Sequence, residues 1–286
     1  MNTLLLWFYM VLQSTVLAWA PALAFGLIGL GVGLFYGWGW KALWLLPVGP
    51  VLVALVLAAW GMALPTQPTP AAAGVTRIAH ANTLLYLNRP AEPKLAFAKN
   101  SGAEVVSLLE ISPELVNILG TISGTYPHMA NSGGRLPMVL LSTYPITRAQ
   151  GWGERMVLYH IAKPNAAYYV LQVHPQSPFT PEAFTMRNER LALLAETLKG
   201  LPQPLIVLGD MNTTPWDSAL APLFTTVQQA GGWRARVPTF PSFMPLTPID
   251  ALYFTQPFTE IGLQHIKVPG SDHLGIVVDL VDARVK

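Results

Sequence analysis

The chain contains no cysteine. This excludes disulfide bonds, zinc sites with Cys ligands and catalysis by a thiol nucleophile. Charge is also scarce: Asp, Glu, Lys and Arg make up 11% of the 286 residues, against about 25% in ordinary soluble domains. Between Met1 and Thr76 the only charged side chain is Lys41, and every Asp and Glu lies at Glu92 or later. The sequence therefore predicts two parts, a nearly uncharged N-terminal segment and a more ordinary globular domain.

The globular domain has no marked excess of either charge. With Lys41 set aside, 16 basic side chains stand against 15 acidic ones. A protein that binds duplex nucleic acid usually carries a strongly basic domain or patch. The charge balance therefore favours a substrate other than nucleic acid, although it leaves nucleic acid open.

The N-terminal segment is one long apolar region. No charged residue lies between residues 4 and 36, and a second apolar run covers residues 42–60. A bilayer core of about 30 Å needs roughly 20 apolar residues per helix. We predict a transmembrane anchor over residues 1–60, with three helices at about 4–20, 22–40 and 42–60, or two as the alternative. A cleaved signal peptide would be shorter and would begin with basic residues.

The rest of the layout follows from the anchor. Residues 61–75 are rich in Pro, Ala and Thr and are predicted to form a linker to a globular domain at 76–286. Basic loops of membrane proteins tend to stay in the cytoplasm. Lys41 therefore favours a multi-pass protein of the cell inner membrane with its globular domain on the periplasmic, extracytoplasmic side.

The globular domain alternates short apolar runs with helical stretches. Short continuous apolar runs are typical of buried strands, and here they lie at 75–79, 105–109, 137–141, 168–173, 204–208 and 274–280. Helices are expected at 90–99, 113–119 and 181–198. Strands interleaved with helices predict an α/β fold in which helices cover sheets.

A polar residue follows most of these predicted strands. A side chain just past a buried strand has a rigid support while its polar group faces a cleft. Oxygen acceptors suit a hard cation and nitrogen donors suit a phosphate. We therefore expect one site to form from Asn82, Glu110, His174, Asp210, Asn212 and Asp250.

Two motifs are the most specific. Asp210 and Asn212 follow a glycine after an apolar strand, and Asp272 and His273 precede a predicted strand. Each motif also occurs in ordinary turns. Glu110 has an alternative explanation too, since a helix N-terminus just after it would favour a carboxylate. His80, His128, His160 and His265 have no clear polar neighbours in the sequence and are interpreted as structural.

In this order along the chain, the polar positions resemble the endonuclease/exonuclease/phosphatase superfamily. The resemblance covers about Thr76 to Val278, and its most specific pieces are the motifs at 209–212 and 271–273. It implies a four-layered α/β/β/α sandwich of two packed sheets. It also implies a metal-dependent phosphoric ester hydrolase that uses Mg²⁺, with Mn²⁺ as an alternative.

The resemblance also implies roles for individual residues. Glu110, Asp272 and the nearby Asn82 would form the metal side of the site. Asp210 would orient or deprotonate the attacking water, and Asn212 would hold the phosphate. His174 and His273 would donate to phosphate oxygens, with Asp250 fixing the ring of His273.

The substrate is less defined than the chemistry. The superfamily's DNA-cleaving branches have a second acidic residue beside a His, or a catalytic Tyr, and neither has an obvious counterpart here. Together with the apolar anchor, this favours hydrolysis of a phosphoester or pyrophosphate bond at the membrane, in a lipid-linked phosphate. The alternatives are a membrane-tethered nuclease or phosphodiesterase and a non-catalytic relative that binds phosphorylated ligands. No protein partner is inferred.

Overall fold

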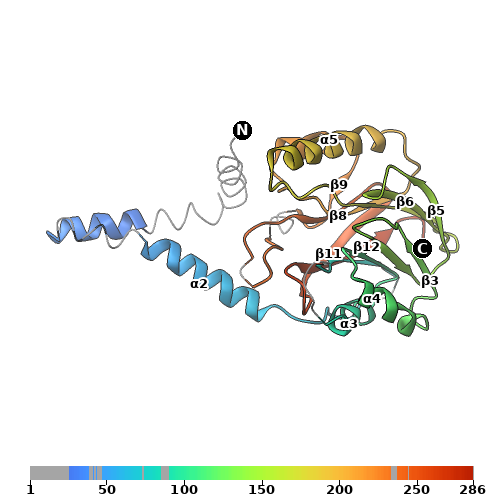
Figure 1. The fold of residues 1–286 in the computed structure, drawn as a ribbon, viewed down its shortest axis with the longest axis horizontal. Helices are drawn as coiled ribbons and strands as arrows, with labels where there is room; N and C mark the ends of the chain where they lie inside the picture. Colours follow the sequence, from blue (N-terminus) through green and yellow to red (C-terminus); the bar gives the residue numbers. More distant parts are fainter. Residues whose placement is uncertain are drawn as a thin grey trace.

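The computed structural model describes residues 26–38, 41, 43, 47–72, 74–84, 90–232, 237–243 and 245–285. Two six-stranded sheets pack face to face (Figure 1). The first sheet contains β1 (Thr76–Asn82), β2 (Val105–Leu109), β3 (His128–Asn131), β4 (Val139–Ser142), β11 (Phe258–Lys267) and β12 (Leu274–Asp282). The second contains β5 (Ile146–Gly151), β6 (Met156–Ile161), β7 (Tyr168–Val173), β8 (Leu205–Asp210), β9 (Gln228–Gln229) and β10 (Asp250–Phe254).

The two sheets are built to the same plan. Their strand orders are β11-β12-β1-β2-β4-β3 and β5-β6-β7-β8-β10-β9. In each sheet the central pair is parallel, β1 with β2 and β7 with β8, and the pairs on either side are antiparallel. The carboxyl ends of a parallel pair therefore lie at the same edge as the amino ends of the flanking antiparallel strands β12 and β10.

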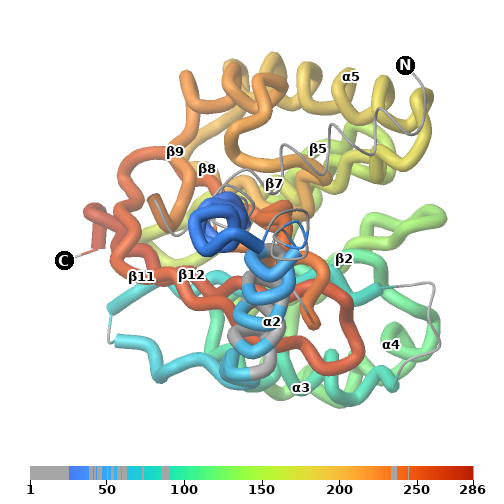
Figure 2. The backbone as a smooth tube through the Cα atoms, turned by 90° about the vertical axis from the view of Figure 1, so that its left-hand side faces the viewer, coloured from blue at the N-terminus to red at the C-terminus, as the bar shows by residue number. Residues whose placement is uncertain are grey.

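Helices cover the outer face of each sheet. The first sheet carries α3 (Glu92–Asn100), α4 (Pro113–Ile118) and the 3₁₀ helix η2 (Leu119–Ile122), and the second carries α5 (Pro181–Leu198) and the 3₁₀ helix η3 (Ser218–Thr225). The sequence marks the start of α5 clearly: Thr180 Oγ1 accepts a hydrogen bond from the backbone N–H of Ala183, and Pro181 occupies the first turn. Figure 2 shows α5 and α3 on opposite sides of the sheets.

The central strands are buried on both faces, which explains their continuous apolar runs. Ile206 and Leu208 of β8 face the core between the sheets, whereas Leu205 and Val207 contact the layer that contains α5. In β2, likewise, Leu109 faces the core between the sheets and Val106 faces the layer with α3. Full burial of one such side chain stabilises the fold by about 1.5–3 kcal/mol. The α/β/β/α sandwich expected from the sequence is confirmed.

The predicted membrane spans are not found in the part of the chain that the structure describes. The first, at 4–20, lies outside the described residues, and the second is described only at 26–38, where 26–35 are helical. In place of the third is α2 (Val48–Ala63), with 16 residues. Such a helix is about 24 Å long, shorter than the roughly 30 Å of a bilayer core. None of the described helices is long and apolar enough to cross a membrane.

The segment after α2 lies against β11. The backbone N–H of Lys267 donates to the carbonyl of Pro65 at 2.8 Å, and Thr69 donates from its N–H and its hydroxyl to Gln264 Oε1. Lys267 pairs with Leu274, the residue after His273. The chain therefore joins the sandwich at the end where β12 begins, and α2 projects from that end (Figures 1 and 2).

Candidate active site

The polar residues predicted from the sequence come together at one end of the sandwich. Asn82 and Asp210 are the last residues of β1 and β8, and Glu110 and His174 directly follow β2 and β7. Asp250 begins β10 rather than following a strand, and it pairs with Asp210. Asp272 and His273 directly precede β12. Because β10 and β12 are antiparallel to their neighbours, their amino ends meet the carboxyl ends of the central strands.

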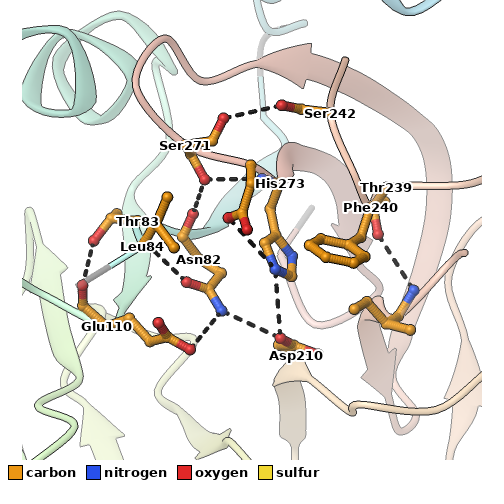
Figure 3. A network of polar contacts seen from close by, with 12 residues as sticks. Asn82, Thr83, Leu84, Glu110, Asp210, Thr239, Phe240, Ser242, Ser271 and His273 are labelled. Atoms are coloured by element: carbon orange, nitrogen blue, oxygen red, sulfur yellow. Dashed lines mark hydrogen bonds and ion pairs between the residues drawn. The ribbon is translucent and has the colours of Figure 1, made fainter. Parts of the chain in front are cut away.

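Asn82 lies at the centre of the site (Figure 3). Its Nδ2 donates to Glu110 Oε1 and to Asp210 Oδ2, both at 3.2 Å. Its Oδ1 accepts from the backbone N–H of Leu84 at 3.1 Å, so the amide nitrogen faces the carboxylates and the oxygen faces away. In this orientation Asn82 holds Glu110 and Asp210 beside each other.

Asp210 is held from several sides. Its Oδ1 accepts from the backbone N–H of Asn212 at 2.8 Å, and its Oδ2 lies 3.9 Å from the Nε2 atoms of both His174 and His273. Burial raises the pKa of the Asp210 carboxyl above its usual range, against the influence of His273. A carboxyl whose pKa is raised toward neutrality is a better general base than an ordinary one.

The close approach of β7 explains why a glycine, Gly209, precedes Asp210. An added Cβ at this position would lie 1.8 Å from the carbonyl oxygen of Val173 on the neighbouring strand. Since His174 follows Val173, this close approach brings His174 and Asp210 side by side. A larger residue would push the two strands apart at the point where they carry these side chains.

His273 is paired with Asp250. Its Nδ1 lies 2.9 Å from Asp250 Oδ2, its backbone N–H donates to Ser271 Oγ, and its ring lies against Phe240. Burial alone would lower the pKa of His273, but the carboxylates of Asp250, Asp210 and Asp272 raise it to about 10. His273 is therefore a cation near neutral pH, suited to donate from Nε2 to a phosphate oxygen.

The pKa of His174 is shifted in the opposite direction from that of His273. Its Nε2 lies 3.3 Å from Glu110 Oε1, but neither ring nitrogen makes a hydrogen bond with any of the described residues. Burial, together with the positive charge of Arg155 and of His273, lowers the pKa of His174 to about 3. His174 is therefore a neutral imidazole. The absence of a carboxylate partner at Nδ1, within the described residues, agrees with the missing second acidic residue in the sequence.

Two residues of the site have a strained backbone conformation. Glu110 and Asn212 have positive φ angles of 51° and 49°, a conformation that costs a non-glycine residue about 1 kcal/mol or more. Asn212 is held there by Arg187 of α5, whose Nη1 donates to its carbonyl at 3.0 Å, and its own Nδ2 donates to the carbonyl of Pro175. The second Nδ2 hydrogen of Asn212 is not used by Pro175 and suits a phosphate oxygen.

The acidic residues of the site fit a divalent cation. Asp210, Asp250 and His273 have ligand atoms within 4.8 Å of one another, but both carboxylate oxygens of Asp250 already accept from His273 and His80. Asp272 is better suited, because its buried Oδ1 has no hydrogen-bond partner among the described residues. Carboxylate oxygens are the ligands that Mg²⁺ and Mn²⁺ prefer. Glu110 lies beside Asp210 through the Asn82 amide, and Asp272 Oδ1 lies 3.9 Å from His273 Nε2, so each of these two carboxylates is a candidate ligand for a cation at the site.

His80 is a site residue that the sequence reasoning missed. It was interpreted as structural, but its Nε2 lies 3.3 Å from Asp250 Oδ1 and its Nδ1 lies 3.2 Å from Ser107 Oγ. A signal was present in the sequence. His80 and Asn82 are two residues apart on one strand, so their side chains point to the same face of the sheet.

Comparisons with known proteins show the family and the fold of this chain. The model of the Endonuclease/Exonuclease/phosphatase family matches residues 66–273, most of the chain. None of the curated proteins matches. A D. rerio TDP2 complexed with a single-strand DNA product is similar in fold, with a TM-score of 0.60 and 16% identity over 72% of this chain and 98% of that one.

Two further solved structures show the same fold. An endonuclease/exonuclease/phosphatase from Beutenbergia cavernae has a TM-score of 0.55 and 18% identity over 72% of this chain and 71% of that one. Sphingomyelinase C from Streptomyces griseocarneus has a TM-score of 0.53 and 15% identity over 74% of this chain and 99% of that one. The chain belongs to the Endonuclease/Exonuclease/phosphatase family. Members of this family are phosphoester hydrolases and are generally metal-dependent.

Proposed function

We propose that this protein hydrolyses a phosphoester or pyrophosphate bond in a lipid-linked phosphate, with Mg²⁺ or Mn²⁺ as cofactor. The observation that carries the hydrolase part is the meeting of Glu110, Asp210 and His273 around the Asn82 amide. The ends of four separate strands, β1, β2, β8 and β12, bring oxygen acceptors and nitrogen donors to a single point. Such an arrangement serves phosphoryl transfer, where positioning and charge neutralisation supply most of the rate.

Each residue has a task in this proposal. Asp210 orients the attacking water and accepts its proton. The imidazolium of His273 and the Asn212 amide donate to the phosphate oxygens, and the neutral His174 holds the phosphate from the side of Glu110. A divalent cation held by Glu110 and Asp272 would neutralise developing negative charge. Asn82 keeps Glu110 and Asp210 in place.

Three observations support a substrate from the membrane. The helix α2 exposes apolar side chains, among them Leu55 and Val56, and it joins the sandwich at the end that carries the site. Two exposed phenylalanines lie at this same end. Phe179 is on the segment between His174 and α5, and Phe243 follows Ser242, whose backbone N–H donates to the carbonyl of Asp272. Apolar surface around a polar site is typical of contact with a membrane or another apolar surface.

The substrate is tested with the full-length chain in mixed micelles of detergent and phospholipid. With Mg²⁺ present, we expect phosphate release from a polyprenyl pyrophosphate at a higher kcat/KM than from a short-chain pyrophosphate with the same head group. Bis-p-nitrophenyl phosphate serves as the soluble phosphodiester in the panel. Equal rates on the long and short chains would argue against the lipid-linked substrate while leaving the hydrolase intact.

A membrane-tethered nuclease is the second candidate. The observation in its favour is the fold similarity to the TDP2 complex with a single-strand DNA product. The near-neutral charge of the globular domain weighs against it. A single-stranded oligonucleotide in the same panel decides between the two, because faster cleavage of the oligonucleotide than of the lipid-linked substrate would favour the nuclease.

We also propose that the protein resides in the inner membrane with its globular domain on the periplasmic side. The support is the apolar N-terminal segment, in which Lys41 is the only charge before Arg77. A fusion of alkaline phosphatase to the C-terminus should be active, and a fusion of a fluorescent protein at the same point should be dark. The reverse pattern would place the domain in the cytoplasm.

A further inference from the structure

A row of polar side chains crosses the core between the two sheets behind the site. Gln172 of β7 and Asp250 of β10 belong to one sheet, and Ser107 of β2 and His80 of β1 belong to the other. Gln172, Ser107 and His80 are completely buried, and Asp250 is 6% exposed. The side chains around them in this core are apolar. Buried polar groups cost free energy unless hydrogen bonds satisfy them, and in this row only Gln172 Oε1 has no such partner among the described residues.

In each hydrogen bond of this row the donor and the acceptor can be assigned, starting from Gln172. Gln172 Nε2 lies 2.8 Å from Ser107 Oγ and 3.0 Å from the carbonyl of Val139. A carbonyl only accepts, so the Gln172 amide nitrogen must point this way and donate to Ser107 Oγ. The Ser107 hydroxyl keeps its own hydrogen for His80 Nδ1, 3.2 Å away. This direction fits the other side of the His80 ring, where the Asp250 carboxylate only accepts and therefore needs the ring hydrogen on Nε2.

The row ends at His273. With Nδ1 accepting, His80 carries its hydrogen on Nε2 and donates to Asp250 Oδ1 at 3.3 Å. The other oxygen, Oδ2, accepts from His273 Nδ1 at 2.9 Å. Both oxygens of Asp250 are therefore held, one from each side. A carboxylate fixed at both oxygens cannot rotate, so it sets the plane and the tautomer of the imidazole that it holds.

We propose that His80 is a positioning residue for the hydrolysis: with Ser107 and Gln172 it fixes Asp250, and through Asp250 it aims His273 Nε2 at the reacting phosphate. This inference rests on the proposed function, because it takes His273 as the phosphate donor. His80 does not touch the substrate in this proposal. Its effect passes through one carboxylate, which distinguishes it from a residue that merely ties the two sheets together.

The test compares His80→Leu, which removes the donor, with His80→Gln, whose Nε2 can still donate to Asp250. We expect His80→Leu to lower kcat about 10- to 100-fold, as for partners behind a directly acting residue, with KM nearly unchanged. His80→Gln should recover most of that loss. Ser107→Ala, which removes the donor to His80 Nδ1, should give a smaller loss than His80→Leu.

A double-mutant cycle separates positioning from a structural role. In an Asp250→Ala background, His80→Leu should cause no further fall in kcat, because its effect passes through Asp250. An equal fall in both backgrounds would overturn the proposal, as would equal losses for His80→Leu and His80→Gln, or wild-type kcat in a folded His80→Leu. If His80→Leu does not fold, His80→Gln and Ser107→Ala decide by the same comparison, and wild-type kcat in Ser107→Ala overturns the proposal.

A second readout does not depend on activity. The hydrogen on His273 Nδ1, which faces Asp250 Oδ2 at 2.9 Å, should give a downfield NMR signal. We expect this signal to shift or broaden in Ser107→Ala and His80→Leu and to stay near its wild-type position in His80→Gln. An unchanged signal in all three variants would overturn the positioning role. A further outcome is that the wild type hydrolyses no substrate while the signal still changes in the variants as expected. In that case the proposed function fails and the link from His80 to His273 stands.

Discussion

Asp210→Asn should lower kcat by about 10²- to 10⁴-fold, the usual contribution of a positioned general base. The amide has nearly the shape of the carboxylate but cannot accept the proton of the attacking water. Asp210 is buried, and its Oδ1 can still accept from the Asn212 N–H as an amide oxygen, so the fold should persist. Hydrolysis of bis-p-nitrophenyl phosphate gives kcat, and thermal unfolding gives Tm.

Asp282→Asn is a matched control for this substitution. Asp282 ends β12, at the opposite end of the strand from the site, and its side chain is 3% exposed, as is that of Asp210. Removing the negative charge of Asp282 breaks the ion pair with Arg284. Asp282→Asn should therefore lower Tm and leave kcat close to wild type. Equal turnover in wild type and Asp210→Asn would show that Asp210 is not the general base, and no turnover above background in the wild type would favour a relative that only binds phosphorylated ligands.

Glu110→Gln should raise the Mg²⁺ concentration for half-maximal activity by about 10-fold or more. The amide keeps an oxygen for the cation but loses the negative charge that attracts it. Chelation with EDTA should abolish activity in the wild type, and added Mg²⁺ or Mn²⁺ should restore it. Mn²⁺ binding followed by electron paramagnetic resonance measures the same loss of affinity without relying on turnover.

Glu104→Gln supplies the comparison for Glu110→Gln. Both glutamate side chains are 12% exposed, but Glu104 forms an ion pair with Lys163 and accepts from Tyr168 away from the site. Its substitution should lower stability and leave the Mg²⁺ dependence unchanged. If Glu110→Gln binds Mn²⁺ as tightly as the wild type does, Glu110 is not a metal ligand.

The central strands and the covering helices could be predicted from the sequence because both of their faces are buried. The strands β2 and β7 and the helix α5 have the bounds expected from their apolar runs and periodicity. The strands β6, β9 and β10 were not predicted, although β6 and β10 are largely buried. The strands β3, β5 and β11 were not predicted either. Their burial alternates or is slight, so local composition does not distinguish them from loops, and the pairing partner decides their conformation.

The sequence predicts which polar residues lie close together but not their electrostatics. The eight residues expected from the sequence lie together, yet His174 and His273 have pKa values shifted in opposite directions. The clearest geometric difference lies at Nδ1: that of His273 is 2.9 Å from Asp250 Oδ2, whereas that of His174 has no hydrogen-bond partner among the described residues. The sequence contains Asp250 and both histidines without indicating which of the two rings the carboxylate meets.

The amino-acid sequence by itself determined the uncharged N-terminal segment, the apolar strands and the polar residues beside their ends, because each depends on neighbours a few positions away. Only the tertiary structure decided that β10 begins at Asp250, that the Asn82 amide turns its nitrogen to the carboxylates, and that His80 belongs to the site. His80 and Asp250 are 170 residues apart. Contacts over such separations depend on how two sheets align face to face, and no local pattern encodes that alignment.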